Sequence, residues 1–342
     1  MSQLICGVRP IVLSHLRLDS FTLILIATVG LASFLPASGD FGRYFHHFSD
    51  FAIALLFFLH GARLSREAVF AGATHWRLHL LVLACTFVMF PILGVAIQAF
   101  APTWLLPEPL AVGVLYLACL PSTVQSSIAF TSMAGGNVPA AICSASASNL
   151  IGVFLTPLLV ALLMKVQGSG GMSLDSVKAI MLQLLVPFVT GHLLRPWIGG
   201  WVAGHKQLVG LVDRGSILSV VYIAFSEAVV NGLWQKMPLD GLAGMIVIAC
   251  VLLVVVLVLT TLFSRWLGFN KADEIAIVFC GSKKSLASGV PIANVLFPAA
   301  QVGMIVLPIM LFHQIQLMAC SALARHYAQR REAAEAGPSP QS

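Results

Sequence analysis

Residues 279–291 read Phe279-Cys-Gly-Ser-Lys-Lys-Ser-Leu-Ala-Ser-Gly-Val-Pro291, and this stretch decides the fold. It places Lys283 and Lys284 in the middle of a segment, Ala272–Phe297, that is otherwise apolar enough to cross a bilayer. A lysine at the centre of a membrane helix costs about 2.5–3.5 kcal/mol on translocon-type scales, so such a residue usually faces a partner or a wet cavity. The surrounding glycines, serines and proline weaken helical hydrogen bonding. The stretch therefore predicts a broken transmembrane helix with a functional site at the break.

The composition is that of a polytopic membrane protein. Of the 342 residues, 58% are hydrophobic and 9% are charged, whereas a soluble domain carries about 25% charged residues. The net charge of +6 does not indicate nucleic acid, because basic residues in membrane proteins mostly mark cytoplasmic loops. The cysteines are scattered without a C-x-x-C pair, so neither a disulfide framework nor a metal site is predicted. The expected surroundings are the lipid bilayer of the plasma membrane, which in a bacterium is the inner membrane.

Ten apolar segments are predicted to span the membrane, since a span needs about 20 mainly apolar residues. They are Asp19–Pro36, Phe48–Arg63, His75–Ala99, Glu108–Ala134, Val138–Lys165, Asp175–Trp197, Asp213–Trp234, Asp240–Leu267, Ala272–Phe297 and Gln301–Arg325. With the N-terminus inside, 13 lysines and arginines flank the spans on the cytoplasmic side and 4 on the outer side. This asymmetry supports ten spans with both termini in the cytoplasm.

The chain divides into two halves of five predicted spans. Residues 168–171, Gly168-Ser-Gly-Gly171, form the central linker between a first repeat, 1–167, and a second, 172–328. Residues 329–342 are predicted to be a disordered cytoplasmic tail. Five spans per half give the halves opposite topology, which is the inverted repeat of many secondary transporters. The fourth span carries its own interruption, Pro121-Ser-Thr-Val-Gln-Ser-Ser127, and two interrupted spans at matching positions predict a binding site.

Six motifs spread over nearly the whole chain carry a resemblance to a known family. They are Phe57-Phe-Leu-His-Gly61, Leu120-Pro-Ser-Thr-Val-Gln-Ser-Ser127, Gly135-Gly-Asn137 with Ala141-Ile-Cys-Ser144, Thr156-Pro-Leu-Leu159, Phe225-Ser-Glu227 and Phe279-Cys-Gly-Ser-Lys-Lys-Ser-Leu286. Together they resemble the SBF-like branch of the bile acid:sodium symporter superfamily. The resemblance implies an all-α polytopic membrane protein with ten transmembrane helices in two inverted five-helix repeats. It also implies that the fourth and ninth helices are broken and cross, with substrate and ions bound near the crossing.

The same resemblance shows where this chain departs from the sodium-coupled branch. There the fourth-helix break reads Pro-Gly-Gly-Thr-Ala-Ser-Asn, and its Ser and Asn help to bind sodium; this chain keeps Ser126 and has Ser127 in place of the Asn. The ninth-helix glutamate shared by two sodium sites corresponds to Phe279, and the Gln-Asn after it becomes Lys283-Lys284. We therefore hypothesise that Lys284, with Lys283, replaces a bound sodium and holds an anionic substrate, because an ammonium supplies one positive charge and three donors.

The predicted site residues form two sets. The substrate-binding set is Lys283, Lys284, Ser285, Gln125, Ser126 and Ser127. The ion-coupling set is Glu227, Ser126, Ser127, Ser146 and Asn149. Glu227 is the one carboxylate well inside a predicted span, and a Glu227–lysine pair that exchanges a proton would allow proton coupling. The alternative for Glu227 is a static packing role, and the intramembrane Gln314/Gln316 pair is predicted only to make buried hydrogen bonds.

These features predict a symporter-like secondary transporter that moves a small organic anion by alternating access, coupled to sodium or to protons. One alternative is a cation/proton exchanger, which should carry carboxylates at the crossing. Another is a membrane regulator of the same fold that transports nothing. The sequence lacks G-x-S-x-G and H-E-x-x-H motifs, so no enzyme is predicted. No cofactor is expected, and sodium is the one bound ion that the resemblance implies.

Overall fold

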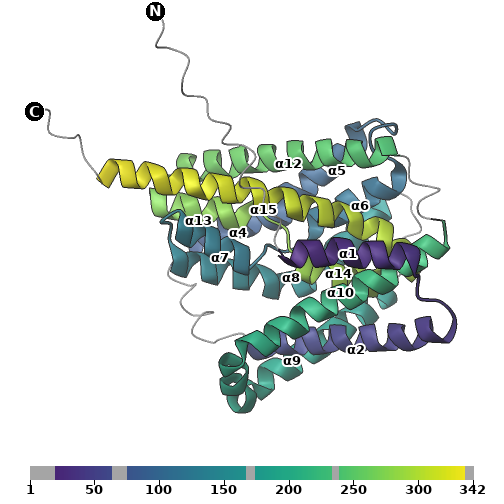
Figure 1. The fold of residues 1–342 in the computed structure, drawn as a ribbon. Helices are drawn as coiled ribbons and strands as arrows, with labels where there is room; N and C mark the ends of the chain where they lie inside the picture. The colour runs from purple at the N-terminus through teal and green to yellow at the C-terminus, as the bar shows by residue number, and fades with distance from the viewer. Residues whose placement is uncertain (1–19, 64–74, 167–173, 233–238, 336–342) are drawn as a thin grey trace, which may run out of the picture.

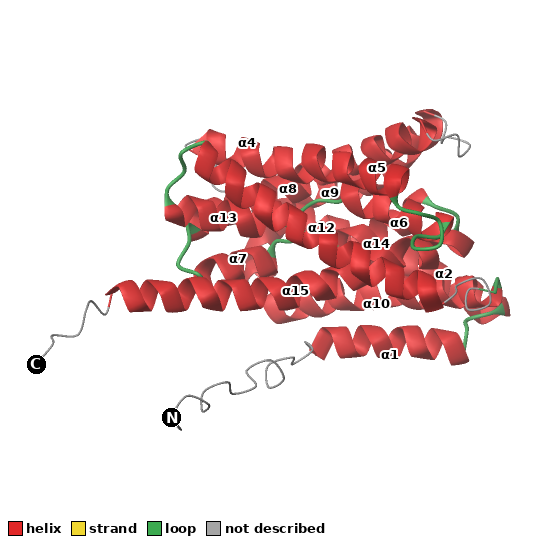
Figure 2. Cartoon of the chain, turned by 90° about the horizontal axis from the view of Figure 1, so that it is seen from above, coloured by secondary structure: helices red, strands yellow, loops and turns green. Residues whose placement is uncertain are grey.

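The computed structural model describes residues 20–63, 75–166, 174–232 and 239–335. Within these ranges all regular secondary structure is helical (Figure 2). The helices are α1 (Ser20–Phe34), α2 (Gly39–Arg63), α4 (Trp76–Ala84), the π-helical turn η2 (Cys85–Met89), α5 (Phe90–Phe100), α6 (Glu108–Cys119), α7 (Gln125–Met133), α8 (Val138–Val166), α9 (Leu174–Gly204), α10 (Lys206–Val230), α12 (Leu239–Trp266), α13 (Lys271–Gly281), α14 (Leu286–Leu296) and α15 (Ala299–Glu335).

Each predicted span falls on a helix, and the fourth and ninth are each divided in two. By length and composition, six segments of the described chain can cross a membrane. They are Trp76–Phe100, Val138–Leu163, Lys206–Val230, Asp240–Trp266, Lys271–Leu296 and Ala299–Arg331. The apolar part of α1 and the whole of α6 are shorter. The protein is thus a helical membrane protein, while the count of ten spans in two inverted repeats stays a prediction.

Several helices extend beyond the predicted spans, because hydropathy marks the bilayer and not the end of helical hydrogen bonding. α9 continues to Gly204 and α10 begins at Lys206, several residues before the predicted start at Asp213. α15 continues to Glu335, so residues 329–335, which were assigned to a disordered tail, are helical. That segment is rich in Ala, Arg and Glu, which are strong helix formers. The predicted central linker lies outside the described residues.

The helices form two packed groups. α2 contacts both α9 and α10, and α1 lies along α10, so these four helices form the smaller group. α2, α9 and α10 lie in the lower part of Figure 1, with α1 above them. The remaining helices form a larger group in which α15 contacts α6, α12 and α14, and α13 contacts α7, α8 and α12. Contacts of α10 with α14 and α15, and of α8 with α9, join the groups. The divided helices therefore belong to the larger group and face the smaller one through α14.

Burial separates the outer helices from the divided ones. In the most apolar 18-residue stretch of α12, 39% of the residues are buried. In the corresponding stretch of the α13–α14 pair, 89% of the residues are buried. Val247, Val251, Val254 and Val258 of α12 are all more than half exposed and follow helical spacing. An apolar stripe of this kind suits contact with lipid and not with water. The break in α13–α14 therefore lies in the protein interior, where its polar groups must find partners within the chain.

Candidate functional site

The first break separates α6, which ends at Cys119, from α7, which begins at Gln125. Pro121 ends α6, because proline has no N–H to donate and forces the residue before it into an extended conformation. Leu120 accordingly has ψ 154°. Residues 120–124 are unwound, so the last carbonyls of α6 need partners outside the helix.

The second break lies between α13 and α14 at residues 282–285. Ser285 caps α14, since its hydroxyl accepts a hydrogen bond from the Ser288 N–H at 3.2 Å. The Ser285 N–H in turn donates to the carbonyl of Pro121 at 2.9 Å. This backbone hydrogen bond joins the two breaks, and we call residues 120–124 and 282–285 together the crossing.

Hydroxyl groups near the first break donate hydrogen bonds to backbone carbonyls at the C-terminus of α13, which have no donor within their own helix. Ser122 Oγ donates to Cys280 O at 2.5 Å, and Ser127 Oγ donates to Phe279 O at 2.9 Å. All four residues are buried. Each broken helix therefore supplies hydrogen-bond partners to the other, which explains how unwound backbone is tolerated at this depth.

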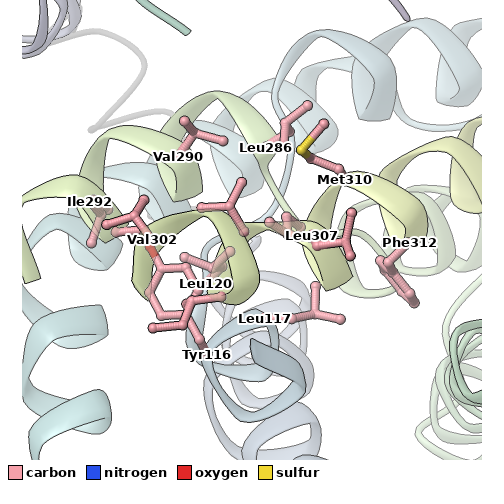
Figure 3. Packing of buried hydrophobic residues seen from close by; sticks show 14 of the residues in the cluster. Tyr116, Leu117, Leu120, Leu286, Val290, Ile292, Val302, Leu307, Met310 and Phe312 are labelled. Atoms are coloured by element: carbon pink, nitrogen blue, oxygen red, sulfur yellow. The ribbon is translucent and has the colours of Figure 1, made fainter. Parts of the chain in front are cut away.

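Apolar packing surrounds this polar centre. Side chains of α6, α14 and α15 gather around the crossing, including Leu117, Leu286 and Met310 (Figure 3). Tyr116 of α6 donates from its hydroxyl to Gly289 O of α14 at 2.5 Å. The packed shell keeps the two broken helices in fixed register.

Lys284 is fully buried at the crossing, and the hydrogen bonds of its ammonium group all go to backbone oxygens. Its Nζ donates to Thr86 O at 2.7 Å, Ala118 O at 2.8 Å and Leu120 O at 2.6 Å. Its backbone is held as well, because the Lys284 N–H donates to Gln316 Oε1 and Gln316 Nε2 donates to Lys284 O, both at 2.9 Å. Lys284 therefore ties together the third, fourth, ninth and tenth predicted spans.

The carbonyl of Thr86 is available to Lys284 for a local reason. In the π-helical turn the Phe90 N–H bonds to Cys85 O, so it does not reach Thr86. The next residue, Pro91, has no N–H. Thr86 O thus loses both neighbouring backbone donors within its own helix, and a π-helical turn of this kind often marks a functional position.

Lys283 is also fully buried but has different surroundings. Its Nζ donates one hydrogen bond, to Ser126 O at 3.0 Å. It lies over the Phe130 ring at 4.0 Å from the centroid and 5.2 Å from that of Phe279, where the aromatic faces attract a cation. Neither Lys283 nor Lys284 forms an ion pair with a carboxylate in the described part of the chain. The two lysines thus bind different partners on separate sides of the crossing.

The other predicted substrate-binding residues lie at the start of α7. Ser126 and Ser127 both share a hydrogen bond with Thr123 Oγ1, at 2.8 and 2.9 Å. Gln125 is exposed and makes no hydrogen bond within the described residues. The structure therefore brings Lys283, Ser126 and Ser127 together, with Gln125 at the edge.

The predicted ion-coupling residues are not gathered at one point. Asn149 Nδ2 donates to Ser122 O at 2.7 Å, and its Oδ1 accepts from Ser288 Oγ at 2.8 Å, so Asn149 lies at the crossing. Ser146 is half-buried on α8 and makes no hydrogen bond to a described residue. Of these two, Asn149 is the one that forms hydrogen bonds with the broken helices.

The predicted Glu227–lysine pair is wrong for this structure. Glu227 lies in the last turn of α10, in the smaller helix group, and lines a cavity of about 340 Å³ with Arg43, His46 and His47. Both lysines have other partners, as described above. Hydropathy could place Glu227 within a span, but it could not tell which helix group holds that span.

Comparison with known proteins decides the family. Residues 19–329 match the SBF-like CPA transporter family. The chain belongs to this family. An uncharacterized protein of Pseudomonas aeruginosa is 61% identical over 318 residues, covering 93% of this chain and 95% of the relative. The Escherichia coli protein named "Putative symporter YfeH" is 60% identical over 319 residues, covering 93% and 96%. The rat protein named "Sodium/bile acid cotransporter 7" is 27% identical over 325 residues, covering 91% and 93%.

Membership confirms the resemblance drawn from the motifs. The chain is an integral membrane protein of a transporter family, which agrees with the prediction that it is not an enzyme. The Escherichia coli relative is named as a putative symporter and the rat relative as a sodium/bile acid cotransporter, and these names describe those proteins. The substrate and the coupling ion of this chain have to be argued from its own crossing.

Sequence reasoning missed some groups that complete the site. Thr86 was not singled out, and its role depends on the π-helical turn, for which Pro91 is the one visible signal. Thr156, quoted only as part of a motif, donates from its hydroxyl to Cys119 O at 2.9 Å. Gln316 was expected to make buried hydrogen bonds, which is confirmed, but its two bonds to the Lys284 backbone were not foreseen.

Replacing Asn149 by alanine is expected to destabilise the crossing. The substitution leaves Ser122 O without its donor and the Ser288 hydroxyl without its acceptor, and a buried unsatisfied group costs about 1–3 kcal/mol. We expect a lower melting temperature of the purified protein, to the same extent in sodium and in choline chloride. Ser146→Ala is the matched control on the same helix and should melt like the wild type. A loss seen in sodium only would show instead that Asn149 binds the ion.

Proposed function

We propose that the protein is a symporter-like secondary transporter of a small organic anion, which binds at the crossing and is released by alternating access. The proposal includes ten spans in two inverted repeats, both termini in the cytoplasm, and sodium or protons as the coupling ion. In a bacterium this places the protein in the inner membrane. Family membership supports transport, and the chemistry of the crossing supports an anion.

The observation that carries the proposal is the buried amine of Lys283, which has no carboxylate partner among the described residues. An ammonium has three N–H donors, and Lys283 uses one of them on Ser126 O, with no further hydrogen-bond acceptor among the described residues. None of the carboxylates in the described ranges forms an ion pair with it. A buried charge with unmet donors is costly, and an anion beside Lys283 would remove that cost. The N-termini of α7 and α14 also lie at the crossing and carry partial positive charge.

The same charges weigh against a cation/proton exchanger. An exchanger needs carboxylates to bind its cation, and the described crossing offers serines, Asn149, Lys283 and Lys284. The acidic pair Asp273 and Glu274 lies at the other end of α13, in its first turn, where Glu274 pairs with Arg265 and Lys271. Asp273 accepts from the side-chain amides of Asn137 and Asn270, so both carboxylates already have partners at that end of the helix.

The function can be tested by a thermal-shift screen of the purified protein against small organic anions. Each anion is measured in sodium chloride and in choline chloride, at two pH values. Binding at a concentration of 100 times Kd stabilises a protein by about 2.7 kcal/mol, which such a screen detects. We expect stabilisation by at least one class of organic anion and none by cations. Stabilisation by a metal cation together with a pH shift would favour the exchanger instead.

Lys283→Gln is expected to weaken anion binding. Glutamine keeps a donor for Ser126 O but loses the positive charge, and a charged hydrogen bond contributes about 1.5–3 kcal/mol. That corresponds to a 10- to 150-fold rise in Kd, measured by titration in the thermal-shift assay. Gln125→Ala, at the edge of the same site, is the control and should change Kd far less. Equal Kd values for the wild type and Lys283→Gln would refute the role of Lys283.

Glu227→Gln tests proton coupling separately. The carboxylate lies in the cavity beside His46 and His47, and the substitution removes its ability to exchange a proton. If protons drive uptake through this group, uptake driven by a pH gradient into proteoliposomes should be lost while counterflow of the anion continues. Glu108→Gln, an exposed carboxylate at the start of α6, serves as the control. Unchanged pH-driven uptake in Glu227→Gln would exclude Glu227 as the coupling group.

A further inference from the structure

The carbonyls around the first break all have protein partners. Leu120 N–H donates to Leu117 O at 3.2 Å, Thr156 Oγ1 to Cys119 O at 2.9 Å, Ser285 N–H to Pro121 O at 2.9 Å and Asn149 Nδ2 to Ser122 O at 2.7 Å. The two carbonyls between them, of Ala118 and Leu120, accept from Lys284 Nζ. In secondary transporters such freed carbonyls at helix breaks are the groups that coordinate sodium. Here the Lys284 side chain occupies their centre.

The number of acceptors around Lys284 Nζ fits a charged side chain. Three carbonyl oxygens lie within 2.8 Å of Nζ, and a carbonyl can only accept. An ammonium has three N–H donors, whereas a neutral amine has two, so only the charged form satisfies all three. The Phe90 ring, 4.1 Å from Nζ to its centroid, adds a cation–π contact. The C-terminus of α6 contributes partial negative charge at the same point.

We propose that the Lys284 ammonium is a covalently held cation in the place of a bound sodium ion, so that this crossing needs no sodium to hold its shape or its solute. Lys284 and Lys283 then have separate roles. Lys284 fills the carbonyl cage and has no donor left for a solute, whereas Lys283 keeps two donors for the anion. The statement about the solute rests on the proposed transport function; the statement about the cage does not.

The cage can be tested on the purified full-length protein without any solute. Melting temperatures of the wild type, Lys284→Ala and Lys283→Ala are measured in sodium, potassium, ethylammonium and choline chloride at equal ionic strength. The wild type should melt at the same temperature in all four salts. Lys284→Ala exposes the three carbonyls and should melt at least about 3 °C higher in sodium or ethylammonium than in choline. Lys283→Ala removes a lysine of equal burial that is outside the cage, and it should show no such difference.

Three results would overturn the proposal. One is a sodium-specific rise in the melting temperature of the wild type, which needs no variant to fold. Another is a Lys284→Ala protein that folds and responds equally to all four salts. The third is the same sodium response in Lys283→Ala as in Lys284→Ala. If the cage behaves as proposed but no organic anion stabilises the wild type, the transport proposal fails alone; if anions bind only with sodium, the cage proposal fails alone.

Discussion

Lys284→Met should give the largest loss of stability among substitutions at the crossing, about 3 kcal/mol or more. Methionine keeps the length and the apolar stem of the side chain but leaves Thr86 O, Ala118 O and Leu120 O without a donor. Each buried unsatisfied acceptor costs about 1–3 kcal/mol. Removal of the buried charge offsets part of this loss, so the estimate takes the low end for each carbonyl. The measurement is thermal or denaturant unfolding in choline chloride, where no small cation can fill the cage.

Lys283→Met is the matched control for this prediction. Both lysines are fully buried and adjacent, but Lys283 gives up a single hydrogen bond, to Ser126 O. Its loss should therefore be about 1 kcal/mol. If the two variants unfold alike, burial alone decides stability at this point and the carbonyl cage contributes nothing particular.

Alanine at Gly61 or Gly191 is the second substitution with a large expected effect. A Cβ at Gly61 would lie 1.9 Å from Phe188 O, and one at Gly191 would lie 1.9 Å from Phe58 O. Both contacts are with backbone of the facing helix, so no side chain can move aside and α2 must separate from α9. Forced overpacking costs about 1–3 kcal/mol and sometimes more. We expect the upper end of that range for each variant, and weaker folding of the α2–α9 pair.

Gly200→Ala on α9 is the control, because nothing lies within 4 Å of the added Cβ. In a helix interior that substitution should be neutral or should stabilise by up to about 1 kcal/mol. Melting temperatures and the yield of monodisperse protein in detergent measure the difference. A Gly61→Ala protein as stable as Gly200→Ala would mean that α2 and α9 are not packed backbone to backbone as described.

Hydropathy and proline placement predicted most of the fold. Apolar runs located the helices because a membrane-spanning segment needs a long apolar stretch, and Pro121 marked the first break because proline cannot continue a helix. The helix ends were less predictable, since α15 continues to Glu335 on good helix formers after its apolar part ends. The sequence does not predict which helices pack together. The pairing of α2 with α9, for example, depends on close tertiary contacts at Gly61 and Gly191, and no local sequence pattern indicates them.

The sequence predicted where the site lies, but not that its two lysines have different roles. Charge at depth identified Lys283 and Lys284 and predicted the same role for both, whereas their side chains bind different oxygens. That division depends on Thr86 O, which is released by a π-helical turn about 200 positions earlier in the chain, and on Gln316. Glu227 was placed correctly within a span but paired with the wrong partners, because a position along a helix does not determine which neighbour it faces.

The most direct test of the account is uptake into proteoliposomes of an organic anion that stabilises the purified protein. Entry is compared with inward gradients of sodium and of choline, for the wild type and for the variant with glutamine at both 283 and 284. We predict that the wild type takes up the anion equally in both salts and that the double variant loses uptake and binding. Strictly sodium-driven uptake, with binding intact in the double variant, would contradict the claim that this crossing carries its own cation.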